Sequence, residues 1–340
     1  MIRRTGLPRG WAPDRNERTV SLLLVALIVF FSITSAATFD TLPSAQNIAI
    51  QTSINGLIGL GQMVVMIGGG IDISVGAVMS MTATLVMISQ PHGVLLSIVI
   101  GLAFGTLVGL INGLLVTKLQ IVPFIATLGT MTVVNGLNHA ISRDLPIPGT
   151  DAGFTFLGAG SVGPIPVPLF FLIAGGLGVH VLLAHTGLGR RVFAVGGNAE
   201  AAHLAGINVD RTRILAFGLC GFLTSLAGVL LASQLNTSSV LLGTSTALFI
   251  LTAAIIGGAS MLGGRGSARG AVLGVLALTV LATGLNGLGV QTAEQTIIRA
   301  LVFIVVVVID ALASQSAGVN RLMARLRKPA GRSDRELTKA

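Results

Sequence analysis

Residues 95–116 read LLSIVIGLAFGTLVGLINGLLV, a run of 22 residues without one charged side chain. A helix needs about 20 predominantly apolar residues to cross the hydrocarbon core of a bilayer, which is about 30 Å thick. The whole chain has the same character, since 52% of its 340 residues are apolar and only 10% are charged, against about 25% charged residues in soluble domains. This composition excludes a soluble cytosolic enzyme, a disordered chain and a secreted disulfide scaffold.

The same search along the chain finds ten candidate membrane spans. They are Val20–Ala37, Ile48–Ile67, Ile71–Ser89, Leu95–Val116, Phe124–Ile141, Val167–Ala184, Ile214–Gln234, Thr246–Leu262, Ala271–Leu288 and Ile297–Ala313. We therefore predict an all-α polytopic membrane protein with about ten transmembrane helices, some of them broken by glycine.

Positive charge orients these spans, because cytoplasmic segments are enriched in Lys and Arg. With both termini in the cytoplasm, all but two of the 21 Lys and Arg residues fall on the inner side. This predicts a basic cytoplasmic tail over 1–19, a transmembrane domain over 20–313 with its longest inner loop near 185–213, and a second basic tail over 314–340. Val20–Ala37 resembles a signal peptide, but its length and the spans that follow favour an uncleaved first helix.

Glycine repeats every four residues at Gly101, Gly105, Gly109 and Gly113. Small residues at this spacing let helix backbones approach closely within a membrane. Two interpretations follow, which are packing within one chain and a seam between two chains, and the first is the commoner use of such a stripe.

Motifs for chemistry on this chain are missing from the sequence. It contains no phosphate-binding G-x-x-x-x-G-K-[S/T] loop, no H-E-x-x-H and no G-x-S-x-G, and its five His form no ligand cluster. We therefore expect no catalytic residue, metal or cofactor on this chain. Basic residues gather in the tails rather than in stripes with aromatic side chains, so we expect no nucleic-acid partner.

A first polar motif is GGGIDISVG at 68–76. Glycines here break the helix, and Asp72 or Ser74 can cap the helix that follows. A carboxylate near the bilayer centre costs roughly 2.5–3.5 kcal/mol on insertion scales, which makes Asp72 a candidate for the translocation path. The alternative is a simple helix cap at the cytoplasmic edge.

A second motif, VPFIATLGT at 122–130, opens a helix with polar residues. Thr127, Thr130 and Asn138 fall on one face of it, at helical spacings. They are further candidates for a polar translocation path, and the alternative is hydrogen bonding between helices.

The long inner loop carries a third motif. Asn198 is placed to cap a short helix Ala199–Ala205 that ends at Gly206, with Glu200 in its first turn. A short helix of small residues has little to pack on, so we expect it to dock in a groove of a partner. The alternative is a loop resting on its own membrane domain. Two Gly-Gly pairs at 257–264 mark a further broken segment.

Five ordered motifs resemble the inner-membrane permease subunit of ribose-type (monosaccharide) ABC importers. They are GGGIDISVGA at 68–77, VPFIATLGTMTVVNGL at 122–137, GRRVFAVGGNAEAAHLAGI at 189–207, AIIGGASMLGGRGS at 254–267 and VFIVVVVIDAL at 302–312. The first motif departs from the family pattern, with Gly68 in place of Thr and Ile73 in place of Leu. Permeases for branched-chain amino acids and autoinducers belong to the same broader group and remain alternatives, as does, more remotely, a secondary transporter.

The resemblance implies a multi-pass protein of the bacterial inner membrane that forms a sugar path but is no enzyme itself. Its implied partners are a second permease chain, a cytoplasmic ATPase that binds MgATP, an extracytoplasmic sugar-binding protein and membrane lipid. The implied ATPase-coupling loop contains Arg190, Gly196, Gly197, Asn198, Glu200, Ala201, Ala202 and Gly206. Asp72, Ser74 and Thr127 match the first two signatures of the family.

Overall fold

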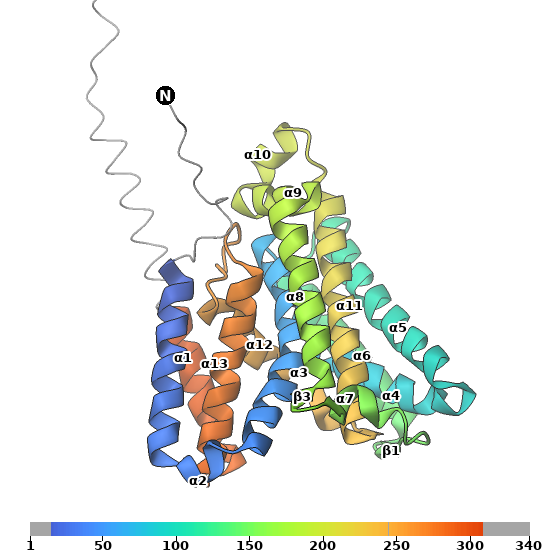
Figure 1. Cartoon of the computed structure of the whole chain (residues 1–340). Helices are drawn as coiled ribbons and strands as arrows, with labels where there is room; N and C mark the ends of the chain where they lie inside the picture. The colour runs from blue at the N-terminus through green and yellow to red at the C-terminus, as the bar shows by residue number, and fades with distance from the viewer. Residues whose placement is uncertain (1–14, 244, 309–340) are drawn as a thin grey trace, which may run out of the picture.

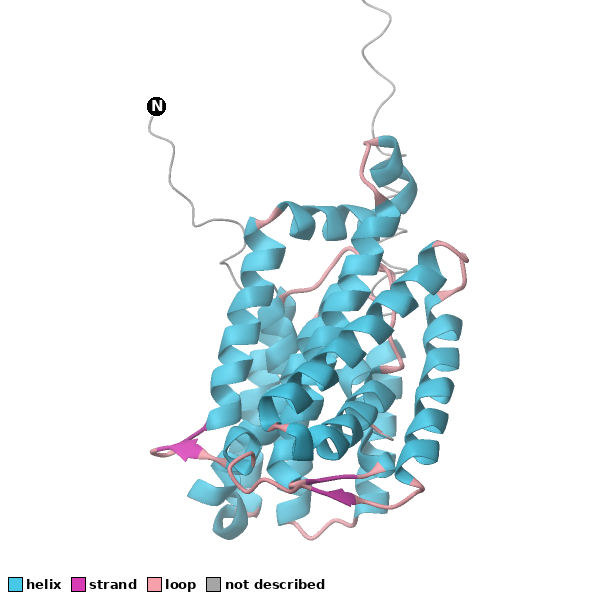
Figure 2. Cartoon of the chain, turned by 90° about the vertical axis from the view of Figure 1, so that its right-hand side faces the viewer, coloured by secondary structure: helices cyan, strands magenta, loops and turns pink. Residues whose placement is uncertain are grey.

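A computed structural model describes residues 15–243 and 245–308, and the chain is mostly helical over these residues (Figures 1 and 2). Its α-helices are α1 Arg15–Thr34, α2 Ala36–Phe39, α3 Leu42–Ile67, α4 Val75–Ser89, α5 Val94–Thr117, α6 Pro123–Ser142, α7 Thr155–Ala159, α8 Val167–His185, α9 Gly187–Gly197, α10 Ala199–Leu204, α11 Val209–Leu235, α12 Thr246–Ile256 and α13 Ala268–Gly287. Residues 292–308 form a further helix. The 3₁₀ turns are η1 Gln90–His92 and η2 Val240–Gly243.

Strands are limited to two short antiparallel pairs in the described part of the chain. β1 Ile147–Pro148 pairs with β4 Thr237–Ser238, and β2 Ser161–Val162 pairs with β3 Ile165–Pro166. Both pairs lie at one end of the molecule, and α9 and α10 lie at the other, which we call the α10 end (Figure 1).

Six of the described helices are long and apolar enough to cross a membrane. They are Glu17–Thr34 within α1, α3, α5, α8, α11 and α13. Large apolar side chains such as Ile33 and Leu95 are 78% and 76% exposed on α1 and α5, as lipid-facing residues would be. The polytopic, all-helical class is thus supported by helix length and composition.

The described parts of the ten predicted segments fall on helices, with differences in three of them. The first is interrupted at Ser35, between α1 and α2. The third begins at Val75 rather than Ile71, because Gly69 adopts a positive φ of 79° that a helix does not tolerate. The eighth ends at Ile256 rather than Leu262, since Gly258, two residues later, has a positive φ that a helix does not adopt. Of the tenth, residues 309–313 lie outside the described residues, as do 1–14 and 314–340 of the predicted basic tails.

The inner loop predicted at 185–213 contains more structure than expected. Besides the short helix, it includes α9, which begins after Thr186 because the Thr186 hydroxyl accepts a hydrogen bond from Gly189 N–H at 3.2 Å. A side-chain acceptor at this position satisfies a backbone donor that the first helical turn leaves free.

The glycine stripe of α5 packs within the chain. A Cβ on Gly105 would lie 2.7 Å from the Gly221 carbonyl oxygen of α11, and one on Gly113 would lie 2.6 Å from Ile214 Cα. The two backbones are therefore in direct contact, and only glycine allows it. Of the two interpretations of the stripe, packing within one chain is the one that the structure shows.

Two helices start inside the molecule rather than at an end. A Cβ on Gly76, in the first turn of α4, would overlap the carbonyl oxygen of Gly243, which precedes α12. With 15 and 11 residues, α4 and α12 are too short to span about 30 Å at 1.5 Å per residue. Their starts meet backbone to backbone. α11 packs against α4, α3 packs against α12, and α3 and α11 pack against each other at the centre of the bundle.

Candidate functional site

The buried Asp72 carboxylate lies between α3, α4 and α5. One of its oxygens accepts hydrogen bonds from the Ser74 N–H at 2.8 Å and the Ser74 hydroxyl at 2.6 Å, and the other lies 3.4 Å from the Asn112 amide nitrogen. The Gln62 carboxamide, turned with its nitrogen toward the Asp72 carbonyl, also pairs with the Asp72 backbone. Asp72 thus closes the turn before α4, and Ser74 precedes the helix without capping it through its side chain.

Two of the buried polar residues of α6 also make contacts between segments. The Thr127 hydroxyl accepts from Ile73 N–H at 3.2 Å, and the Asn138 amide donates to the Ser80 hydroxyl at 2.9 Å. Thr130 is half-buried and donates to the Ala126 carbonyl in its own helix. The structure therefore shows the interhelical hydrogen bonds that were one of the two interpretations, and a role in a polar path stays a prediction for these residues.

The predicted short helix of the inner loop is confirmed as α10. Asn198 Oδ1 accepts from Ala201 N–H at 2.9 Å, and Gly206 ends the helix with a φ of 79° while Ile207 N–H bonds back to the Ala202 carbonyl. This is a Schellman-type end, which requires a left-handed residue that glycine supplies.

α10 projects from the bundle (Figure 1). Glu200, Ala201 and Arg190 are exposed, whereas Ala202 is buried against the rest of the loop. Leu204 was not predicted from the sequence, and its side chain is 83% exposed at the end of this helix. An exposed large apolar side chain on a projecting helix can be buried in a groove of a partner protein.

Behind α10, three backbone segments meet at glycine. A Cβ on Gly196 would overlap the Ile67 carbonyl oxygen at the end of α3 and lie 2.7 Å from Gly264 N. Gly264 N–H in turn donates to that same Ile67 oxygen at 2.9 Å. We call Gly196, Ile67 and Gly264 the backbone junction, because α9, α3 and the segment after α12 touch there through main-chain atoms.

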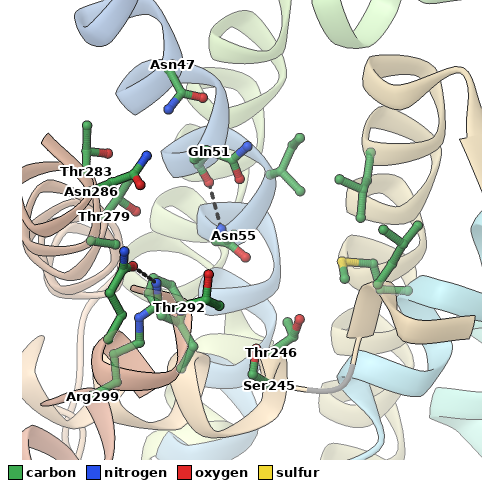
Figure 3. Close-up of a pocket in the computed structure, with 17 residues that line it drawn as sticks. Asn47, Gln51, Asn55, Ser245, Thr246, Thr279, Thr283, Asn286, Thr292 and Arg299 are labelled. Atoms are coloured by element: carbon green, nitrogen blue, oxygen red, sulfur yellow. Dashed lines mark hydrogen bonds between the residues drawn. The ribbon is translucent and has the colours of Figure 1, made fainter. Parts of the chain in front are cut away.

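A polar cavity of about 410 Å³ lies farther along α3, away from the α10 end (Figure 3). Most of its walls come from α3, α13, the helix 292–308 and the start of α12. The polar lining residues are Asn47, Gln51, Asn55, Ser245, Thr246, Thr279, Thr283, Asn286, Thr292, Gln295 and Arg299. None of the five predicted path residues lines it.

The sequence carries a periodic polar signal for this cavity. Asn47, Gln51 and Asn55 recur every four residues along α3, so they lie on one face of the helix. The same spacing of three or four residues places three polar residues each on α13 and on the helix 292–308. Polar faces on membrane helices point to the bundle interior or to water.

Amide and hydroxyl groups give the cavity both hydrogen-bond donors and acceptors, without a carboxylate among the lining residues that the structure describes. Such a lining suits a neutral polar solute with several hydroxyl groups. The cavity and the backbone junction lie on the same helix, α3, which therefore connects the cavity to the projecting α10 region.

A comparison with known protein families gives an independent finding. Residues 44–307 match the family described as branched-chain amino acid transport system / permease component, which is well over half of the chain. The chain belongs to this permease family. No solved structure gives a significant match to it.

Individual relatives of this permease cover nearly its whole length. The ribose import permease protein of Bacillus subtilis (strain 168) is 39% identical over 291 residues, which are 84% of this chain and 90% of that protein. The ribose import permease protein of Escherichia coli (strain K12) is 34% identical over 89% of this chain and 95% of its own. The galactose/methyl galactoside import permease protein of the same strain is 34% identical over 86% and 92%.

Proposed function

We propose that this permease is the membrane subunit of an ATP-driven importer of monosaccharides, located in the bacterial inner membrane. The observation that carries the proposal is its similarity, over most of both chains, to ribose and galactose import permeases. The polar cavity supports the same substrate class, because amides and hydroxyls can replace the water molecules around a sugar without binding it irreversibly.

The proposed topology has ten membrane segments and both termini in the cytoplasm. The six long apolar helices are six of these segments, and α4, α6, α12 and the helix 292–308 are the other four. In this orientation α10 lies on the cytoplasmic side and the cavity lies nearer the opposite surface. Lys118, Arg190, Arg211 and Arg265 then face the cytoplasm, as the distribution of positive charge requires.

The proposed assembly has two permease chains, a separate ATPase that binds MgATP, and an extracytoplasmic protein that delivers the sugar. The coupling loop, with Asn198, Glu200 and Ala202 in and beside α10, contacts the ATPase. A closing ATPase would push α10 and, through the backbone junction, the end of α3. That push moves the face of α3 that lines the cavity, so the solute path opens alternately to each side.

An amino-acid substrate, suggested by the family description, fits the cavity less well. A free amino acid carries an ammonium group, and the described lining residues offer no carboxylate to pair with it. A buried charge without a partner is strongly unfavourable. We therefore favour a sugar over an amino acid as the substrate of this permease.

Uptake by whole cells tests the proposal directly. The gene is deleted from its host, and uptake of labelled D-ribose, D-galactose and L-leucine is measured before and after restoring the full chain. We expect a loss of at least one sugar, unchanged leucine uptake, and a sugar uptake that stops when ATP is depleted. Sugar uptake should continue with a protonophore while ATP is maintained. Loss of leucine uptake, or proton-driven sugar uptake, would contradict the proposal.

A further inference from the structure

Arg299 carries the one formal charge among the described residues that line the polar cavity. It lies two turns into the helix 292–308, about 10 Å along the axis from Thr292 at the start of that helix. It is also one of only two Lys or Arg residues that the positive-inside assignment leaves off the cytoplasmic side. A charged side chain within a membrane domain marks a functional site by default.

The guanidinium of Arg299 is held in place without an acid. Its Nη2 donates to Gln295 Oε1 at 3.1 Å, and its Cζ lies 6.0 Å from the centre of the Phe249 ring (Figure 3). The ion pairs of the described residues lie elsewhere, at Lys118–Asp210 and His139–Asp144. The positive charge is therefore held in position, and no acidic side chain of residues 15–243 and 245–308 forms an ion pair with it.

Hydrogen-bonding capacity also remains in the cavity wall. Among the described residues, Arg299 Nε and Thr279 Oγ1 are buried and have no hydrogen-bond partner in the protein. Both residues line the cavity. A planar guanidinium presents its donors as a rigid fork, which matches a carboxylate or a pair of adjacent hydroxyl oxygens.

We propose that Arg299 selects the permeant by charge. The cavity admits neutral and acidic polyhydroxylated solutes, such as aldoses and uronic acids, and rejects those that carry an ammonium group, such as amino sugars. This inference rests on the proposed function, because it takes the polar cavity as the solute path. The physical reason is that a fixed positive charge attracts an anion and repels a cation of the same size.

A reporter cysteine measures this selection without any sugar or binding protein. Asn55→Cys places a thiol in the cavity wall, and the native Cys220 is fully buried. The purified full chain is treated with an anionic and a cationic methanethiosulfonate reagent, and the rate of modification is measured for each. The ratio of the anionic to the cationic rate is then compared with Arg299 present and with Arg299→Gln. Ala201→Cys on the exposed side of α10 is the matched control.

We expect Arg299→Gln to lower the ratio at Asn55→Cys by about fivefold. This is the effect of one water-screened positive charge that raises the rate of the anionic reagent and lowers the rate of the cationic reagent. Arg299→Lys should preserve the ratio, and the ratio at Ala201→Cys should not change. A ratio at Asn55→Cys that stays within twofold after Arg299→Gln would overturn the inference. Failure of both reagents to reach Asn55→Cys would instead overturn the cavity as the solute path, and with it this part of the proposed function.

Discussion

The backbone junction predicts that a single methyl group at Gly196 uncouples the transporter. In Gly196→Ala the new Cβ would overlap the Ile67 carbonyl oxygen, which is also the acceptor for Gly264 N–H. The two atoms that the Cβ would meet, Ile67 O and Gly264 N, both belong to the main chain, so no side-chain rotation can relieve the clash. α9 must therefore move away from the end of α3, and the hydrogen bond to Gly264 is displaced or lost.

The size of the effect follows from these contacts. Overpacking a well-filled interior costs about 1–3 kcal/mol, and a lost internal hydrogen bond adds about 1 kcal/mol. Since about 1.4 kcal/mol corresponds to a factor of ten, a contact equilibrium weakened by about 2 kcal/mol shifts by roughly 30-fold. We expect sugar uptake to fall at least tenfold when Gly196 is replaced by Ala.

Gly187→Ala is the matched control, because it lies in the same helix, outside the residues of the coupling loop, and its Cβ would meet only the Arg190 side chain, at an ordinary distance of 3.9 Å. Alanine is a better helix former than glycine by up to about 1 kcal/mol, so this variant should be neutral or stabilising. The assay compares initial uptake rates in the deletion host, normalised to the amount of each chain in the membrane, and ATPase activity of the assembled complex. Normal uptake by Gly196→Ala, or an equal loss in Gly187→Ala, would refute the reasoning.

Other variants test the remaining contacts. Asn198→Ala removes the cap of α10 and should weaken retention of the ATPase on purification by about 0.5–2 kcal/mol, whereas Asn198→Asp should preserve it; equal retention in all three chains would contradict a docking role. Asp72→Ala leaves the donors of Ser74 unpaired and should lower thermal stability by about 1–3 kcal/mol, and Asp72→Asn should lose less, as measured by thermal unfolding in detergent. Lys118→Ala breaks the exposed pair with Asp210 and should change stability by less than about 1 kcal/mol, an effect that salt should abolish.

Local features of this fold were predictable from sequence. The cap at Asn198 and the left-handed end at Gly206 follow from side-chain and backbone preferences over a few residues, and both are confirmed. The long apolar spans follow from hydropathy, and six of them form helices of membrane-crossing length.

Features that depend on contacts far apart in the sequence were not predictable in the same way. The Asp72 carboxylate lies within hydrogen-bonding distance of the Asn112 amide, 40 residues away. This distant residue places the carboxylate in an interhelical contact. The cavity needs polar faces from segments that are separated by more than 200 residues, and no local rule reports that they converge. The close approach of Gly76 to Gly243, 167 residues apart in the sequence, is again a tertiary contact.

One consequence of the layout of α3 concerns how such transporters can be re-engineered. This helix has 26 residues, and its Asn47–Asn55 face and its Ile67 end are separated by eleven buried residues, 56–66. The half of α3 that lines the cavity can therefore be redesigned while the half that ends at the backbone junction keeps its contacts, because the two sets of side chains do not overlap. α3 therefore links two separate functions within one rigid helix. Grafting a different first half onto it should yield importers with a new substrate and unchanged coupling to the ATPase.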